Sequence, residues 1–257
     1  MRILSGRLAV AVMAFALAAI MMLAAALIIH ARSAPPPLGL APARSSSTAS
    51  RTPPAELLSI CRRPASSAPS SRLGGLWLVQ HGSVAGYRAH ERLAGIAAPS
   101  EAVARTEQVA GWGMVKGISS TSWQLAASCF AVDLRTLISQ DSIPGFKMSD
   151  RDDNVRGFLH TDLHPFGLLH ISDAAISAAH ATTATATLSG ELELNGIIKP
   201  ATFAVDLRMD GGQISVAGHA VVLAEDYQIE LPKDAVTFID VDSHITVEFA
   251  AVLERTS

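Results

Sequence analysis

The sequence predicts an all-β protein, an extended antiparallel barrel of eight strands with one or two short helices, preceded by an N-terminal transmembrane helix. Three observations predict this fold class. The second half of the chain alternates apolar and polar residues, turn signals separate the alternating runs, and one uncharged segment near the N-terminus is long enough to cross a bilayer. A two-sheet sandwich is the alternative, but closing the sheet into a barrel leaves neither edge open.

The N-terminal segment, residues 1–30, is predicted to anchor the chain in a membrane. Residues 8–29 are 22 consecutive apolar residues, and a helix of that length spans roughly 33 Å. A cleaved signal peptide is the alternative, but its apolar region is shorter, and the only nearby cleavage sequence, Arg32-Ser33-Ala34, precedes three prolines. We expect an uncleaved single-pass anchor in the cell membrane. Arginines on its two sides nearly balance, and we favour the bulk of the chain on the extracytoplasmic side.

Residues 31–72 are predicted to form a flexible linker. They hold eight of the 13 prolines, many serines and alanines, and almost no apolar periodicity. As a coil, this stretch spans on the order of 36 Å, so a domain beyond it reaches the bilayer surface without docking on it. Solvation of the linker arginines is favoured over their attraction to anionic lipid.

Charge is distributed unevenly between this N-terminal part and the main domain, residues 73–257. Positions 1–72 hold eight basic residues and one acidic residue, which leaves 12 basic and 22 acidic residues in the remainder. Sequence-independent binding to nucleic acid needs a basic face that displaces counterions from phosphates. An acidic main domain therefore argues against nucleic acid as a partner.

The main domain contains eight candidate strands. Four segments have strand-like composition: 76–89, 109–116, 122–134 and 166–176. Four later runs alternate apolar and polar residues with period two: 187–194, 201–210, 213–222 and 244–254. Asn195-Gly196 between two of these runs is a strong hairpin signal. A helix is expected over residues 152–159, capped by Ser149 or Asp150, and a second short helix near residues 98–104.

The alternation places both large and small side chains on the inward faces of the predicted barrel. An eight-stranded barrel is either filled by side chains or wide enough for one small ligand. Gly218 and Ala220, among bulkier neighbours, predict an open apolar tunnel; in the alternative, small residues serve strand curvature or the taper of a filled barrel. The residues expected to line the tunnel are Leu192, Leu194, Phe203, Val205, Leu207, Val216, Gly218, Ala220, Val222 and Phe249.

Patterns typical of catalysis are weak. The segment 82–86 resembles a nucleophile elbow, but its serine stands one place too early and in a strand pattern. Cys129 lies in an apolar strand, as a small core residue does. Cys61 and Cys129 are too few for a disulfide framework, and whether they form one bridge is left open.

Four residues around one helix end form the only imidazole cluster: His160, Asp162, His164 and His170. They straddle Pro165, so nothing fixes them on one face. Exposed or hydrogen-bonded histidines are therefore favoured over a metal site.

Five stretches within residues 74–256 carry a further combination of motifs. They are 77–87 (WLVQHGSVAGY), 111–117, 130–137 (FAVDLRTL) followed by Asp141, 151–165 (RDDNVRGFLHTDLHP) and 190–205 (GELELNGIIKPATFAV). The turn with Lys199-Pro200, and the charged helix followed by Thr161-Asp162 and then Pro165, are the most specific. Together they resemble the YceI-like family of lipid- and polyisoprenoid-binding proteins, particularly the actinobacterial type. At residues 225–228 the chain departs from the family, with Glu-Asp-Tyr-Gln where a basic residue usually precedes an aspartate, an aromatic residue and glycine.

The resemblance implies an extended lipocalin-like barrel with an elongated apolar tunnel that binds or carries isoprenoid chains. We therefore expect a non-enzymatic protein that binds, stores or transports a long isoprenoid lipid, a polyprenyl chain or quinone, with no other cofactor and no metal. One alternative is a filled barrel acting as a cell-envelope stress or adaptor protein. Another is a hydrolase or isomerase, for which the inward faces offer no titratable group. The lipid's length and head group, and the choice between monomer and homodimer, are left open.

Overall fold

The computed structural model describes residues 21–22, 34–41, 55–64, 74–93, 100–117, 122–143, 146–177, 182–210, 212–234 and 239–256. Apart from Met21 and Met22, the expected membrane segment lies outside these ranges. Within them, no helix is both long enough and apolar enough to cross a bilayer.

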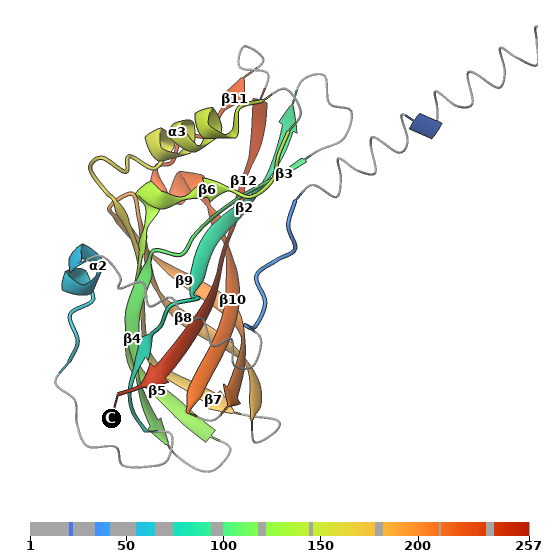
Figure 1. Cartoon of the computed structure of the whole chain (residues 1–257). Helices are drawn as coiled ribbons and strands as arrows, with labels where there is room; N and C mark the ends of the chain where they lie inside the picture. The colour runs from blue at the N-terminus through green and yellow to red at the C-terminus, as the bar shows by residue number, and fades with distance from the viewer. Residues whose placement is uncertain are drawn as a thin grey trace, which may run out of the picture.

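Eight antiparallel strands form a closed ring, which confirms the predicted barrel (Figure 1). The closure is made by the last strand, which pairs with the first: Trp77 lies opposite Arg255. Around the ring the order is β1 (Gly75–Val79), β4 (Val109–Gly117), β5 (Ser122–Asp133), β7 (Phe166–Ser177), β8 (Thr183–Leu194), β9 (Ile197–Asp210), β10 (Gln213–Leu223) and β12 (Ile239–Arg255).

A second set of strands lengthens the barrel at one end. β12 has 17 residues; its C-terminal end pairs with β1, and most of the rest pairs with β2 (Val84–Leu93). β3 (Ser100–Thr106) pairs with β2, and the short β6 (Ile138–Ser139) pairs with β3. β11 (Lys233–Asp234) pairs with the start of β12.

Two local predictions in this region are wrong. The run expected over residues 76–89 is divided into β1 and β2 by a turn in which Gly82 has φ of 88°. The short helix expected near residues 98–104 is the strand β3. Its alanine-rich sequence favours a helix, but Ala102, Val103 and Ala104 are buried where β3 pairs with β2, and tertiary packing overrides local propensity.

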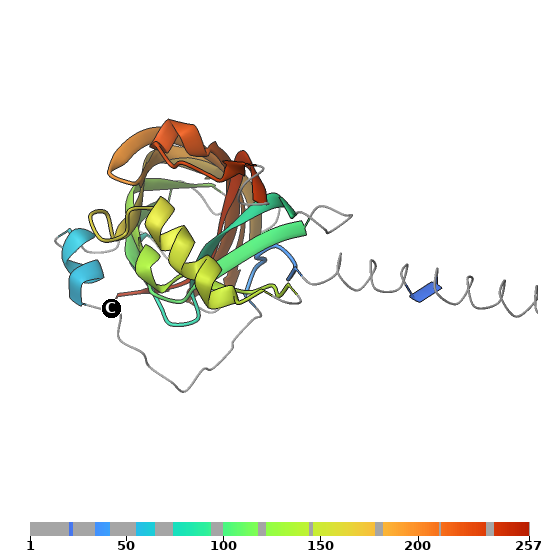
Figure 2. The ribbon, with the colours of Figure 1, turned by 90° about the horizontal axis from the view of Figure 1, so that it is seen from above.

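The expected helix over residues 152–159 is present as α3 (Met148–Phe158), which crosses one end of the barrel (Figure 2). We call this end the mouth. The predicted cap is wrong, because the helix starts earlier than expected. Its N-cap residue is Lys147, and no side chain caps it. The short 3₁₀ turns η1 (Leu134–Thr136) and η2 (Ala224–Tyr227) also lie at the mouth end.

The Asn195-Gly196 hairpin is confirmed between β8 and β9. Both residues have positive φ, 51° and 71°, as a tight two-residue hairpin requires. The Asn195 amide donates to the carbonyl oxygen of Tyr227 at 3.0 Å, which ties the hairpin to η2. A Cβ on Gly196 would lie 2.5 Å from the His164 ring, so glycine also allows this close packing.

Part of the expected linker packs on the barrel through the helix α2 (Ala55–Ile60). Its Leu57 is fully buried in a small outer cluster with Ala110 and Ala131. Cys61, just after α2, forms a disulfide with Cys129 of β5, with the two Cα atoms 5.5 Å apart. The disulfide resolves the pairing that the sequence left open.

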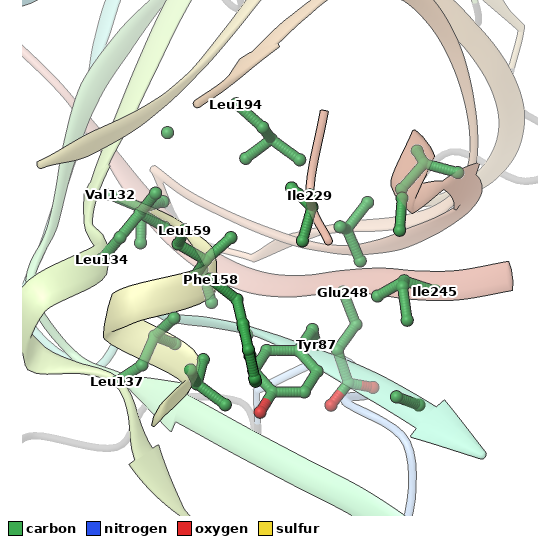
Figure 3. A pocket seen from close by; sticks show the side chains of 18 of the residues that line it. Tyr87, Val132, Leu134, Leu137, Phe158, Leu159, Leu194, Ile229, Ile245 and Glu248 are labelled. Carbon is green, nitrogen blue, oxygen red and sulfur yellow. The ribbon is translucent and has the colours of Figure 1, made fainter. Parts of the chain in front are cut away.

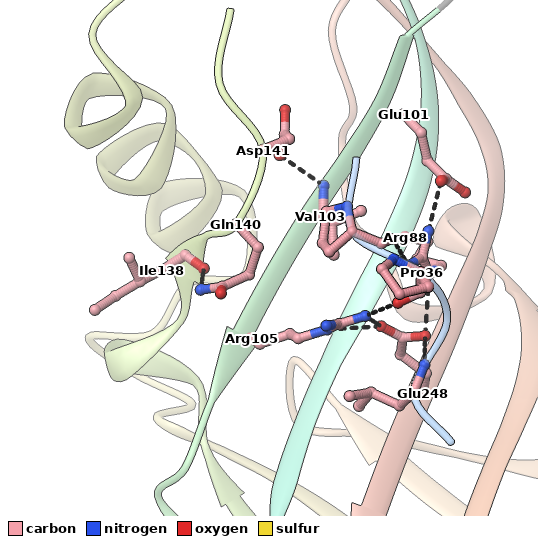
Figure 4. A network of polar contacts seen from close by, with 11 residues as sticks. Pro36, Arg88, Glu101, Val103, Arg105, Ile138, Gln140, Asp141 and Glu248 are labelled. Atoms are coloured by element: carbon pink, nitrogen blue, oxygen red, sulfur yellow. Dashed lines mark hydrogen bonds and ion pairs between the residues drawn. The ribbon is translucent and has the colours of Figure 1, made fainter. Parts of the chain in front are cut away.

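A second part of the expected linker, residues 34–41, lies along the outside of β2, β3 and β12. We call it the strap (Figure 4). Its Leu38 amide donates to Glu248 at 3.0 Å, and its Pro35 and Pro36 carbonyl oxygens accept hydrogen bonds from Arg88 and Arg105. Further along, Arg208 donates to the carbonyl oxygen of Ala41. These contacts fix the strap against the barrel wall.

Candidate ligand-binding cavity

The mouth half of the barrel contains an apolar cavity of about 430 Å³ (Figure 3). This volume falls within the range of roughly 300–1,000 Å³ that is usual for small-molecule sites. Most of its walls are aliphatic and aromatic side chains, among them Val132, Leu134, Leu159, Leu194, Ile229 and Ile245. Such walls favour apolar ligands.

The helix α3 forms the cover of this cavity. Arg151, Asn154, Val155, Phe158 and Leu159 all line it, and their spacing of three or four residues places them on one face of the helix. The helix thus presents a mainly apolar face to the cavity, although none of its side chains is fully buried. The sequence contained this spacing, but Phe158 and its neighbours were not predicted as site residues.

Ion pairs at the edge of the cavity hold α3 in place. Arg151 pairs with Asp141, and its Nη1 lies 3.3 Å from Glu91 of β2. Asp141 also accepts a hydrogen bond at 3.0 Å from the backbone of Val103. Asp152 accepts one at 3.0 Å from the Ser139 backbone. The cover is therefore attached to β2, β3 and β6 through buried or half-buried charges.

Tyr87 places one polar atom against this cavity. It lies on β2, in the same inward row as Ala85, Ala89 and Glu91, and Figure 3 shows its ring among the side chains that line the cavity. No side chain or backbone group in the described ranges forms a hydrogen bond with that hydroxyl. Burial raises the pKa of Tyr87, so the phenol is protonated at neutral pH and can donate to a ligand.

The charged side chains that line the cavity are all paired. Glu248 is 3.0 Å from Arg88 and 2.9 Å from Arg105, while Glu91 and Arg151 contact each other. No unpaired cation among the described residues faces the interior, so an anionic ligand group would gain no partner there. A neutral polar group of a ligand can accept a hydrogen bond from the Tyr87 hydroxyl without disturbing these ion pairs.

A smaller cavity of about 80 Å³ lies deeper in the barrel, away from the mouth. Phe130 and Phe249 line both cavities and therefore stand between them. Phe249 also packs against Phe203, with ring centroids 5.8 Å apart. Aromatic side chains thus divide the interior into a large upper space and a small lower one.

The ten residues expected to line a tunnel are all on inward faces of the barrel, but they are divided between three environments. Five line the large cavity: Leu192, Leu194, Phe203, Val222 and Phe249. Leu207 and Val216 line only the small cavity. Val205, Gly218 and Ala220 line neither.

Gly218 does not provide the opening that its size suggested. A Cβ at this position would lie 2.7 Å from Val205 Cγ1 and 2.8 Å from Phe249 Cζ. The Phe249 ring and Val205 therefore already occupy the space beside the glycine. The large cavity instead lies nearer the mouth, beside Tyr87 and α3. Alternation along residues 84–93 was the sequence signal that could have indicated Tyr87.

Two histidines of the predicted cluster contact the β8–β9 hairpin at the mouth. His160 Nδ1 is 3.0 Å from Asn195 Oδ1, and His164 packs on Gly196. His170 is on the outside, where its ring nitrogen lies 4.0 Å from Cys129 Sγ. Within the described ranges, no three His, Cys, Asp or Glu side chains are grouped as metal ligands.

A closed antiparallel barrel around an apolar internal cavity, covered by one helix, defines the structural class of this protein. The model of the YceI-like domain family matches residues 101–253, more than half of the chain. The chain therefore belongs to the YceI-like family. No curated protein matches it.

Several solved structures are similar at low identity. A polyisoprenoid-binding domain from Saccharophagus degradans, implicated in plant cell wall breakdown, is 13% identical with a TM-score of 0.48, over 70% of this chain and 98% of that one. BcnA from Burkholderia cenocepacia is 14% identical with a TM-score of 0.43, over 65% and 95%. The YceI protein of Campylobacter jejuni is 8% identical with a TM-score of 0.41, over 57% and 82%.

Proposed function

We propose that this protein binds a long, uncharged isoprenoid lipid, a polyprenol or quinone, in the large cavity and stores or transports it without changing it chemically. The observation that carries the proposal is the apolar cavity of about 430 Å³ under α3. Burial of roughly 600 Å² of apolar ligand surface supplies on the order of 15 kcal/mol before association and ordering costs. Such a cavity binds without an ionic anchor.

The polar contacts of the cavity support a neutral head group. Glu91, Arg151 and Glu248 each have an oppositely charged partner, so a pyrophosphate would meet no free cation. The Tyr87 hydroxyl is a donor that suits a quinone carbonyl or a polyprenol hydroxyl. The cavity weighs against the alternative of a filled barrel that acts only as an adaptor.

We also propose that the barrel is extracytoplasmic and anchored to the cell membrane by residues 8–29. The 22-residue apolar run supports the anchor. The Cys61–Cys129 disulfide supports the location, because disulfides persist in oxidising compartments outside the cytosol. Recovery of the protein in the soluble fraction, with a mature N-terminus near Pro35, would overturn the anchor.

Mass spectrometry of lipid extracted from the purified protein tests the ligand, and the two tyrosines supply a matched pair of variants. Tyr87→Phe removes the hydroxyl in the cavity, whereas Tyr227→Phe changes a tyrosine that does not line it. We expect Tyr87→Phe to weaken retention of a quinone or polyprenol about 3- to 10-fold, the value of one net hydrogen bond. Tyr227→Phe should leave retention unchanged. Parent protein that is folded and free of isoprenoid would refute the proposal.

A further inference from the structure

Large apolar side chains are exposed at the mouth of the barrel. Phe146 precedes α3 and is 49% exposed, Leu163 follows α3 and is 70% exposed, and Ile198 beside the β8–β9 hairpin is 58% exposed. We call these three residues the mouth face. Phe146 and Leu163 flank the helix that covers the large cavity, and Ile198 follows the hairpin whose Gly196 packs on His164, next to Leu163. Figure 2 looks down onto this end of the barrel. Apolar groups exposed together in this way are typical of a surface that meets a partner.

The strap points its N-terminal end toward this mouth. Arg88, which binds Pro35, pairs with Thr246 of β12, beside residues that line the large cavity. Arg208, which binds Ala41, pairs with Ser215, close to the β9–β10 turn at the opposite end. The strap therefore runs down the barrel wall from the mouth half, and the chain before Ala34 leaves from that half.

The distance to the expected membrane anchor is short. Four residues separate Ile29, the last of the apolar run, from Ala34, the first residue of the strap. At about 3.5 Å per residue, the five steps from Ile29 to Ala34 reach roughly 18 Å even when fully extended. Because the strap is bound to the wall, the mouth half of the barrel must stay near the bilayer surface if residues 8–29 span it.

We propose that the mouth face rests on the bilayer, with Phe146, Leu163 and Ile198 in the headgroup layer and the cover of the cavity facing the membrane. This inference rests on the proposed function for its anchor and its lipid. The short tether keeps the barrel at high local concentration over the surface, so a weak contact is sufficient. Lipid then moves between the bilayer and the cavity beneath α3 without crossing bulk water.

The charged residues around the mouth limit how deeply the mouth face enters the bilayer. Asp150 and Asp153 on the outer side of α3 are exposed, as are Asp162, Glu225 and Asp226 in the neighbouring loops. Carboxylates of this kind stop the face at headgroup depth. Because these five carboxylates outnumber the two exposed lysines next to the mouth face, Lys147 and Lys199, the face has no net attraction to anionic lipid, in contrast to a basic membrane-binding patch.

The test places a tryptophan on the mouth face of the full chain, reconstituted in phosphatidylcholine vesicles that contain brominated phosphatidylcholine, which quenches tryptophan within the bilayer. Leu163→Trp is the test variant and Ile198→Trp the second. Lys116→Trp is the control, because Lys116 is exposed on β4 at the opposite end of the barrel. We expect the brominated lipid to remove part of the added emission at residues 163 and 198, as it does for tryptophan at headgroup depth, and almost none of it at residue 116. Adding phosphatidylglycerol should not increase the quenching.

Several outcomes would overturn the inference. No quenching at residues 163 and 198 in a folded, vesicle-bound protein would show that the mouth faces water. Equal quenching at all three positions would show that the barrel has no fixed orientation. A dimer that Leu163→Asp converts to monomers, without quenching at residue 163, would assign the face to a second copy of the chain. Mass spectrometry of the same vesicles reports bound isoprenoid separately, so failure of docking is distinguishable from failure of ligand binding.

Discussion

Glu248 joins the barrel wall to the strap. Its side chain is 2% exposed and pairs with both Arg88 and Arg105, while the Leu38 amide of the strap donates to the same carboxylate. Alternation with the inward-facing Phe249 places Glu248 on the outer face of the last strand, where a carboxylate is normally solvated. It could not predict the burial, because the partners are 143 and 160 residues away in sequence.

We expect Glu248→Gln to lower the free energy of unfolding by roughly 3–5 kcal/mol, because it leaves two buried guanidinium groups without this carboxylate. Urea denaturation followed by circular dichroism measures the change. Glu254→Gln, at an exposed position on the same strand, is the control and should alter stability little. A loss below about 1 kcal/mol at Glu248 would show that water reaches the pair and screens it.

The two tyrosines give a pH-dependent prediction at the same scale. Burial raises the pKa of both Tyr87 and Tyr227 above the ordinary value near 10. As pH rises, the phenols of the unfolded chain therefore lose their protons before those of the folded protein. The contribution of the two protonated phenols to the free energy of unfolding is complete below about pH 10, and it is lost as pH rises through their folded-state pKa values. We expect little phenolate absorbance from the native protein at pH ~10 and full absorbance after denaturation. Half-ionisation of the native protein at that pH would contradict the burial.

The elements that the sequence could predict are those with strong local patterns. Strands such as β8 and β9 follow from period-two alternation, and their hairpin follows from Asn195-Gly196. The strand β3 and the helix α2 were missed for a common physical reason: alanine-rich or proline-rich sequence carries little local preference, and long-range contacts fix its structure. Leu57 is buried only because α2 packs on β4 and β5.

The Cys61–Cys129 bridge determines how firmly α2 is attached. In the chain-entropy account, a bridge across 68 residues of sequence contributes about 4 kcal/mol. We therefore expect Cys61→Ser to lower the free energy of unfolding by an amount of that order, as measured by urea titration. Cys129→Ser and the double variant should show the same loss, because each removes one bridge. Losses that add in the double variant would show that the thiols contribute separately.

Removing residues 1–72 deletes the strap, α2 and the bridge but none of the strands β1 to β12 in the described part of the chain. We expect the remaining chain to give a β-rich circular dichroism spectrum and to melt cooperatively, at a lower temperature than a chain that begins at residue 34. A disordered spectrum would mean that the strap and α2 are required for folding. Equal melting temperatures would mean that their contacts with the barrel contribute no net stability.

On the scale of the whole molecule, the interior is determined by how the rows of inward side chains meet, which alternation alone does not specify. The sequence indicated which face of each strand points inward, and every one of the ten expected residues is on such a face. It could not indicate that Phe249 fills the space beside Gly218, because this contact depends on the register between β10 and β12. The open volume therefore lies nearer the mouth than the glycine and alanine positions suggested.

The aromatic partition leads to a prediction about ligand length. Phe130 and Phe249 separate the cavities of about 430 Å³ and 80 Å³, so Phe249→Ala should join them and deepen the site. We expect the bound isoprenoids to shift toward longer chains, as read by mass spectrometry of extracted lipid. The stability loss should stay below the roughly 3–5 kcal/mol typical of a fully packed phenylalanine, because the ring already borders open space.

Phe166→Ala is the matched control for this change. Phe166 lies on the outer side of the barrel, with the Arg135 guanidinium 5.1 Å from its ring centre, and lines neither cavity. It should cost stability without altering the lengths of the bound chains. If Phe249→Ala folds and retains the parent's lipids unchanged, the partition does not limit the ligand, and the large cavity alone determines which chain fits.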